Sequence, residues 1–235
     1  MAEAAGTRPT PPAGAVVLGA VFVAALATAQ LTAAKVLAFG LPFALPLAGA
    51  ELTLPGAALA YALTFLASDC YTELYGREAA QVLVNVAFAM NFLVLALVWS
   101  TILAPAASTS IDPAAFELVL GASTNIVAGS LLAYVVSQNL DVVIFDRLRE
   151  ATGGEALWLR NVTSTATSQL VDTVIFVSVA FWIVPRTVGI GPRPPAAVVV
   201  SLVVGQYVLK LLIALLDTPF VYLITGAIRR SETTG

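Results

Sequence analysis

The sequence contains no histidine and only one cysteine, Cys70. Without histidine there is no His-ligated zinc site, no Ser-His-Asp triad and no histidine proton relay. A single thiol forms neither an intrachain disulfide nor a cysteine metal cluster. These absences exclude several large classes of enzyme, and we expect no metal and no other cofactor.

Charged residues are also scarce. They make up 11% of the 235 residues, whereas a soluble domain carries about 25%. Hydrophobic residues make up 59%, and the mean hydropathy is +0.93. So few charges cannot cover the surface of a water-soluble globule, and the sequence therefore predicts an integral membrane protein. Its net charge of −3 offers no basic surface for nucleic acid.

Six apolar segments approach the roughly 20 residues that a membrane-spanning helix requires. We expect these spans at 14–36, 55–71, 79–103, 118–140, 162–184 and 197–224. The predicted fold class is an all-α integral membrane protein, a bundle of six transmembrane helices. Between the first two spans, the apolar segment 39–52 is interpreted as re-entrant or interfacial. No connection is large enough for a soluble domain, so residues 14–228 should form a single membrane domain.

Arginine is distributed unequally between the two sides of such a bundle. With six spans, one side contains Arg8, Arg77, Arg147, Arg149, Arg160, Arg229 and Arg230. The other side has only Arg186 and Arg193 in its loops. Because cytoplasmic loops carry the excess of Lys and Arg, both termini are predicted to be cytoplasmic. The N-terminal tail 1–13 and the C-terminal tail 229–235 have compositions typical of disorder.

Ionisable residues inside the predicted spans are costly to bury. An unpaired charge at the bilayer centre costs about 3 kcal/mol on insertion scales, so Asp172, Lys210 and Asp217 together would cost about 9 kcal/mol. That sum is comparable to the net stability of a whole protein. We therefore expect these residues to face the bundle interior, where they pair with one another or line a water-filled cavity.

The polar residues of the fifth span lie on one face of a helix. The stripe consists of Asn161, Thr165, Ser168 or Gln169, and Asp172, and Ser164 belongs to the same polar stretch. The opposite face, with Val171 and Ile175, is apolar and can face lipid. The span is therefore predicted to be polar towards a cavity and apolar towards the bilayer.

The sixth span repeats this pattern. Gln206, Lys210 and Asp217 share one helical face. Pro219 follows and has no N–H to donate, so it should kink the helix and free a backbone carbonyl near Leu215. A kinked helix with a spare carbonyl beside a carboxylate suits a binding site.

These patterns also have structural interpretations. Asp172, Lys210 and Asp217 could be buried ion pairs that hold the bundle together. In the second span, Asp69 and Glu73 are like charges at i and i+4, which is unfavourable unless a cation or donor lies between them, but they could instead form a solvated helix end. The candidate substrate-binding residues are Asn161, Ser164, Ser168, Gln169, Asp172, Gln206, Lys210, Asp217, Asp69 and Glu73.

Three stretches resemble the signature of a known family. SDCYTELYG (68–76) is similar to its S-D-x-x-x-E-x-Y-G motif. WLRNVTSTATSQLVDT (158–173) is similar to W-L-R-N-x-x-S-T-x-x-S-Q-x-x-D-T, and QYVLKLLIALLDTP (206–219) to Q-Y-x-x-K-x-x-x-A-x-x-D-T-P. Together they resemble the queuosine precursor transporter family, which is grouped with vitamin-uptake carriers. Cys70 departs from the family's usual aliphatic residue, and the first span matches only loosely.

The resemblance implies a six-helix carrier of the plasma (inner) membrane. Such a carrier imports a 7-deazaguanine precursor of queuosine or archaeosine, chiefly 7-cyano-7-deazaguanine (preQ0), for tRNA modification. The candidate residues suit this base. A carboxylate such as Asp172 or Asp217 can accept its adjacent N–H and NH₂ donors. Its carbonyl can accept from Lys210, Gln169, Asn161 or Gln206, and an aromatic ring can stack on its face.

Two other interpretations stay open at this point. A substrate-binding subunit of a multi-subunit (ECF-type) vitamin importer is also a small six-helix protein, but it needs separate ATPase partners. An intramembrane enzyme without histidine would need a Ser-Lys or Asp-Asp arrangement, and no recognised motif of that kind is present. We expect a carrier rather than an enzyme. Its expected partners are a small base and the lipid bilayer, not nucleic acid, and a homo-oligomer is left open.

Overall fold

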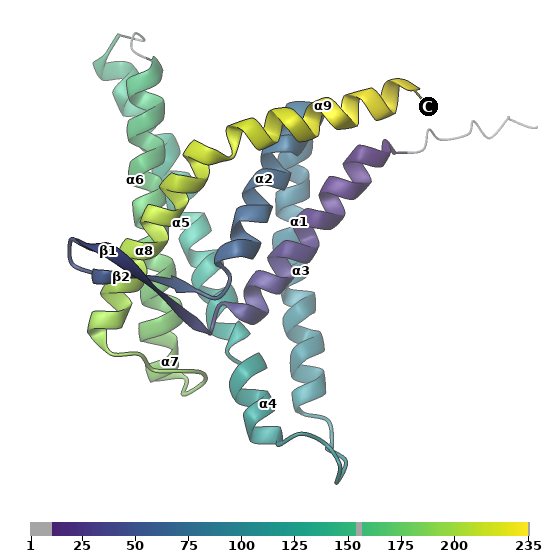
Figure 1. The fold of residues 1–235 in the computed structure, drawn as a ribbon, viewed down its shortest axis with the longest axis vertical. Helices are drawn as coiled ribbons and strands as arrows, with labels where there is room; N and C mark the ends of the chain where they lie inside the picture. Colours follow the sequence, from purple (N-terminus) through teal and green to yellow (C-terminus); the bar gives the residue numbers. More distant parts are fainter. Residues whose placement is uncertain (1–10, 154–156, 235) are drawn as a thin grey trace, which may run out of the picture.

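The computed structural model describes residues 11–153 and 157–234, and helices packed into a bundle dominate it (Figure 1). Most of the predicted tail 1–13 lies outside these residues, as do the side chains at 157, 158, 160, 161 and 232–234. The helices are α1 (Ala13–Thr32), α2 (Ala58–Tyr75), α3 (Arg77–Ile102), α4 (Pro113–Leu120), α5 (Ser123–Ala151), α6 (Leu157–Val177), the π-helix η1 (Ser178–Ile183), α7 (Val184–Thr187), α8 (Ala196–Leu216) and α9 (Thr218–Thr234).

Within this part of the chain, five helical segments are long and apolar enough to cross a membrane. They are Ala13–Thr32, Arg77–Ile102, Pro113–Ala151, Val162–Thr187 and Ala196–Leu216. The prediction of a multi-pass helical membrane protein is thus confirmed. The second predicted span also forms a helix, α2, but Asp69 and Glu73 in its second half lower its mean hydropathy. A count of six spans therefore stays a prediction.

The segment between α1 and α2 differs from the all-helical expectation, because it forms a β-hairpin. Strand β1 (Val36–Leu45) pairs antiparallel with β2 (Gly49–Pro55), and the pairing is irregular between Gly40 and Leu45. Pro42 lies within that irregular stretch, where a missing N–H is tolerated. Its fixed φ and missing donor also disfavour the interior of a helix, which explains why this apolar stretch is not a further helical turn.

The hairpin is held against α8 by a close approach of two backbones. A Cβ atom at Gly205 would lie 2.0 Å from the carbonyl oxygen of Thr53. Real Cβ atoms do not come that close to an oxygen, so only glycine lets β2 lie this near to α8. The C-terminal part of β2, from Thr53 to Pro55, is accordingly buried.

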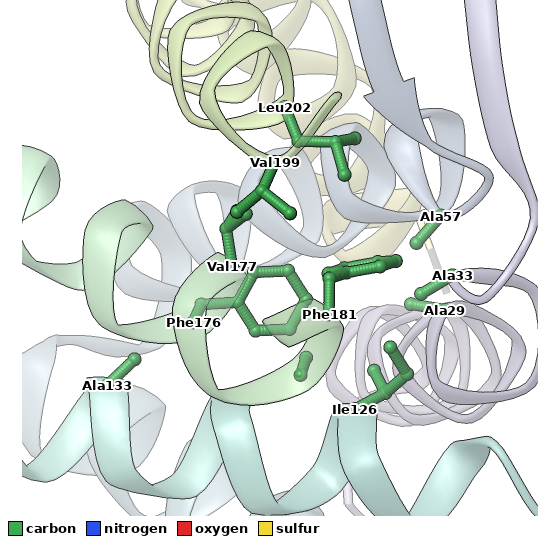
Figure 2. Close-up of a cluster of buried hydrophobic side chains, with 11 residues drawn as sticks. Ala29, Ala33, Ala57, Ile126, Ala133, Phe176, Val177, Phe181, Val199 and Leu202 are labelled. Carbon is green, nitrogen blue, oxygen red and sulfur yellow. The ribbon is translucent and has the colours of Figure 1, made fainter. Parts of the chain in front are cut away.

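A buried apolar cluster fixes the positions of the helices that carry the candidate site (Figure 2). Phe176 and Phe181 pack edge to face, with ring centroids 6.0 Å apart. They fill the space between Ile126 of α5 and Leu202 of α8 (Figure 2). Aromatic residues contribute much of the apolar area in such cores, so this cluster locks α5, α6 and α8 together beside the polar residues of α6.

The fifth span contains a distortion that its sequence explains. After Val177 the helix widens into η1 and then continues as α7 with Pro185 in its first turn. Pro185 cannot donate to a carbonyl one turn earlier. The guanidinium of Arg186 instead donates to the carbonyl oxygens of Phe181 and Trp182, at 3.3 and 3.2 Å.

The predicted kink near Pro219 is present. Helix α8 ends at Leu216, α9 begins at Thr218, and Asp217 lies at the junction. Helix α9 then turns away from α8 and crosses the end of α2 (Figure 1). The expectation of a disordered tail after residue 228 is wrong, because α9 stays helical to Thr234. The polar composition of the C-terminal residues is also compatible with a surface helix, and α9 packs against α2 over part of its length.

Candidate functional site

Lys210 of α8 and Asp172 of α6 form a buried ion pair, with Lys210 Nζ 2.5 Å from Asp172 Oδ2. The Lys210 side chain is 7% exposed and that of Asp172 is 23% exposed. Ser137 of α5 donates a hydrogen bond from Oγ to the other carboxylate oxygen, at 3.2 Å. Three helices thus meet at one carboxylate. Each charge keeps a partner, which offsets part of the free-energy cost of burying it.

The ion pair lies in the wall of a cavity of about 260 Å³. Helices α1, α2, α3, α5, α6 and α8 all contribute to its lining. Its polar lining includes Ser137, Gln169, Asp172 and Lys210, together with Thr64, Ser68, Ser130 and Gln138. This volume is slightly below the roughly 300 Å³ at which typical ligand pockets begin, so the cavity suits only a small molecule.

Aromatic rings form much of the remaining wall: Phe22, Tyr61, Phe65, Phe88, Tyr134 and Phe176. Phe88 and Tyr134 are stacked, with centroids 4.5 Å apart and ring planes at 26°. Gln81 donates from Nε2 to the Tyr134 hydroxyl at 3.0 Å, which holds that ring in place. Flat apolar faces next to a charged pair suit a planar heterocycle, because rings stack while edge groups bond to the charges.

The structure brings three of the candidate residues together at the cavity: Gln169, Asp172 and Lys210. Gln206 is buried behind Lys210, in a small gap that Tyr61 and Phe65 also line. Its Oε1 has no hydrogen-bond partner among the described residues. The predicted shared face of Gln206 and Lys210 therefore exists, with only the lysine reaching the main cavity.

Ser164 and Ser168 are not among the residues that line the cavity. Both are buried on α6, and Ser168 donates from Oγ to Asp141 of α5 at 3.1 Å. The same hydroxyl lies 3.1 Å from the carbonyl oxygen of Thr165, one turn earlier, so its single proton is shared between the two acceptors. This part of the polar stripe joins α6 to α5. The side chain of Asn161 lies outside the part of the chain that the structure describes.

The remaining candidates gather where α2 approaches the junction of α8 and α9. The carboxyl groups of Asp69 and Asp217 lie close enough to interact electrostatically. Glu73 pairs with Arg229 of α9 at 2.8 Å, and both side chains are about half exposed. Asp69, Glu73 and Asp217 are not among the residues that line the cavity.

Sequence reasoning missed the contribution of α2, α3 and α5 to the cavity. In α5, Ser130, Tyr134 and Ser137 recur at i, i+4 and i+7 and all line it. That spacing was available in the sequence as a signal of a shared helical face. In the same helix, Gly129 allows a close approach to α6, since a Cβ atom at Gly129 would lie 3.0 Å from the Phe176 carbonyl oxygen.

The helices are of the length and hydropathy that cross membranes, and they surround a cavity lined by aromatic rings and a buried ion pair. This combination is typical of a multi-pass carrier of small molecules. Comparisons with known proteins agree. A family model described as "Putative vitamin uptake transporter" matches residues 55–224. The match covers more than half of the chain, so the chain belongs to the vitamin uptake transporter family and is a membrane transporter, not an enzyme.

Two curated relatives are both named "Probable queuosine precursor transporter". The protein of Bacillus subtilis (strain 168) is 34% identical over 163 residues, which cover 69% of this chain and 67% of the relative. The protein of Haemophilus influenzae (strain ATCC 51907 / DSM 11121 / KW20 / Rd) is 29% identical over 127 residues, covering 53% of this chain and 50% of the relative. No solved structure matches the chain.

Proposed function

We propose that this protein imports a 7-deazaguanine precursor of queuosine or archaeosine, namely 7-cyano-7-deazaguanine (preQ0). Two relatives with names of queuosine precursor transporters support the substrate class. The observation that carries the proposal is the Asp172–Lys210 pair in the wall of an aromatic-lined cavity. It supplies the charges and the flat faces that this base requires.

The proposed binding mode replaces one set of polar contacts by another. In the structure, Lys210 and Ser137 satisfy the Asp172 carboxylate. The base presents an N–H and an NH₂ group side by side, which a carboxylate accepts as a pair, and a carbonyl that an ammonium can bond. Both buried charges therefore keep partners when substrate enters. Rings such as Phe88 and Tyr134 would stack on the base, worth roughly 1–3 kcal/mol.

The membrane arrangement follows as part of the proposal. With α2 as the sixth span, residues 14–228 form a single carrier domain whose two termini face the cytoplasm of a plasma membrane. The cytoplasmic side then contains Arg77, Arg147, Arg149 and Arg229. This agrees with the excess of Lys and Arg that cytoplasmic loops carry. The proposed partners are the base and the lipid bilayer, without nucleic acid.

Uptake of labelled 7-cyano-7-deazaguanine by a host that cannot synthesise the precursor tests this function. The wild-type chain should restore uptake, whereas Asp172→Asn and Lys210→Met should reduce it at least tenfold. Asp146→Asn and Lys35→Met serve as matched controls, because both residues are exposed and lie outside the cavity. If Asp172→Asn and Lys210→Met express normally and transport at the wild-type rate, the proposed site is wrong.

A further inference from the structure

We propose that the side-chain amides of Gln138 and Gln169 bind the edge of the base that carries N3 and N9–H, so that the carrier accepts the free base and rejects forms substituted at N9. This inference rests on the proposed function, since it assigns two residues to one edge of that substrate. Gln138 lies on α5 and Gln169 on α6, and both line the cavity.

Two hydrogen bonds between α5 and α6 place these amides at the same depth. Ser137 of α5 donates to Asp172 of α6 at 3.2 Å, and Ser168 of α6 donates to Asp141 of α5 at 3.1 Å. The two helices run antiparallel and side by side (Figure 1), so the bonds lie about one helical turn apart. Each glutamine directly follows one of the two serines. Both amides therefore start from the short stretch between the two bonds.

Both amides are accessible and free to bind a molecule in the cavity. Gln138 is exposed and Gln169 is partly buried, and neither side chain has a hydrogen-bond partner among the described residues. The next amide along α5 differs in both respects. Asn139 donates from Nδ2 to the carbonyl oxygen of Val135 at 2.6 Å, and it does not line the cavity. The two glutamines are thus the amides that the cavity wall offers to a ligand at this depth.

The chemistry of an amide matches one edge of the base. A glutamine side chain offers a carbonyl acceptor and an NH₂ donor side by side. On a 7-deazaguanine the N9–H donor and the N3 acceptor are also adjacent, so an amide can pair with both, as amides pair with two atoms of adenine. This edge begins next to the exocyclic NH₂ group, which the proposed binding mode assigns to Asp172. Gln169 precedes Asp172 by three residues on the same helical face, next to the carboxylate.

Only the free base presents this edge complete. In a nucleoside, N9 carries the sugar and has no hydrogen to donate. The amide carbonyl that faces N9 would then lose its donor, and a site built to hydrogen-bond an N–H group disfavours a ligand that lacks it. The cavity volume of about 260 Å³ acts in the same direction, because it leaves little room for a sugar beside the base. Hydrogen bonding and size thus select the same form of the substrate.

Binding of two probes to the purified full-length chain tests this inference: 7-cyano-7-deazaguanine and its 9-methyl derivative, which removes the N9–H donor with the smallest added group. Wild type should bind the free base about tenfold more tightly than the methylated one. Gln138→Leu and Gln169→Leu should each weaken binding of the free base about tenfold and that of the 9-methyl derivative less than about twofold. Asn139→Leu is the matched control and should bind both probes as wild type does, because this amide lies outside the cavity.

The outcomes separate the two proposals. If wild type binds the free base and the 9-methyl derivative equally well, or if the leucine variants weaken both probes by the same factor or neither of them, the amides do not read N9 and this inference fails alone. If wild type binds neither probe, the proposed function fails and this inference falls with it. The wild-type comparison requires no substitution, so it decides the claim even where a leucine variant does not fold.

Discussion

Lys210 and Asp172 are 38 residues apart in the sequence, yet their side chains meet at 2.5 Å in the cavity wall. The packing of α6 against α8 through Val177, Val199 and Leu202 brings them together (Figure 2). The ion pair is therefore both a structural link between two helices and the strongest polar feature of the cavity. The two roles can be separated by experiment.

Breaking the pair on one side should destabilise the protein more than removing it entirely. Lys210→Met leaves the Asp172 carboxylate buried with Ser137 as its remaining partner, and we expect a loss of about 3–5 kcal/mol. The double variant Asp172→Leu/Lys210→Met buries no charge and should recover most of that loss. Thermal unfolding in detergent measures both. Equal melting temperatures of the single variant and wild type would show that the pair is not formed.

The Tyr134 ring should matter more than its hydroxyl. Tyr134→Leu removes a face that stacks on Phe88 and borders the cavity, so binding of the base should weaken by roughly 1–3 kcal/mol. Tyr134→Phe loses only the hydrogen bond from Gln81 and should bind within about threefold of wild type. Equilibrium binding of labelled base measures both variants. Equal losses in the two would argue against stacking.

Gly205 should be intolerant of any side chain. In Gly205→Ala the new Cβ atom would meet the Thr53 carbonyl oxygen at 2.0 Å, so β2 must move away from α8. We expect a fall in the melting temperature corresponding to about 1–3 kcal/mol. Gly226→Ala in α9 is the matched control, because its Cβ meets no atom within 4 Å. If both alanine variants melt alike, the hairpin does not pack on α8.

The number of spans can be read from the positions of the termini. With α2 as a sixth span, the two ends of the chain lie on the same side of the membrane, whereas five spans place them on opposite sides. Single cysteines at Ala2 and Ser231, in a Cys70→Ala background, report this through a membrane-impermeant thiol reagent. We expect neither to be labelled in intact cells and both after permeabilisation. Labelling of only one in intact cells would exclude six spans.

The sequence predicted the bundle and part of its site for a clear physical reason. Charges are so costly in a membrane that Asp172 and Lys210 had to face inward, and each lies on a helical stripe that hydropathy reveals. The same logic could not choose a partner for Asp217, because a stripe gives the direction of a side chain but not the helix it meets. The structure places Asp217 near Asp69 instead.

Two other features escaped sequence reasoning. The hairpin of β1 and β2 is as apolar as its neighbours, and only Pro42 and Pro46 hinted that it is not helical. The aromatic walls of the cavity were hidden because Phe88 and Tyr134 belong to residue types that usually serve packing. Their role depends on which rings come together around an empty space, and that is a property of tertiary structure.

Transport by the purified chain alone in liposomes tests the central claim most directly. Proteoliposomes with wild-type protein should take up labelled 7-cyano-7-deazaguanine without any ATPase. Those with the charge-balanced variant Asp172→Leu/Lys210→Met should not, although that variant should melt close to wild type. Equal uptake by the two would contradict a site at this ion pair. No uptake by wild type unless ATPase subunits are added would contradict a self-sufficient carrier.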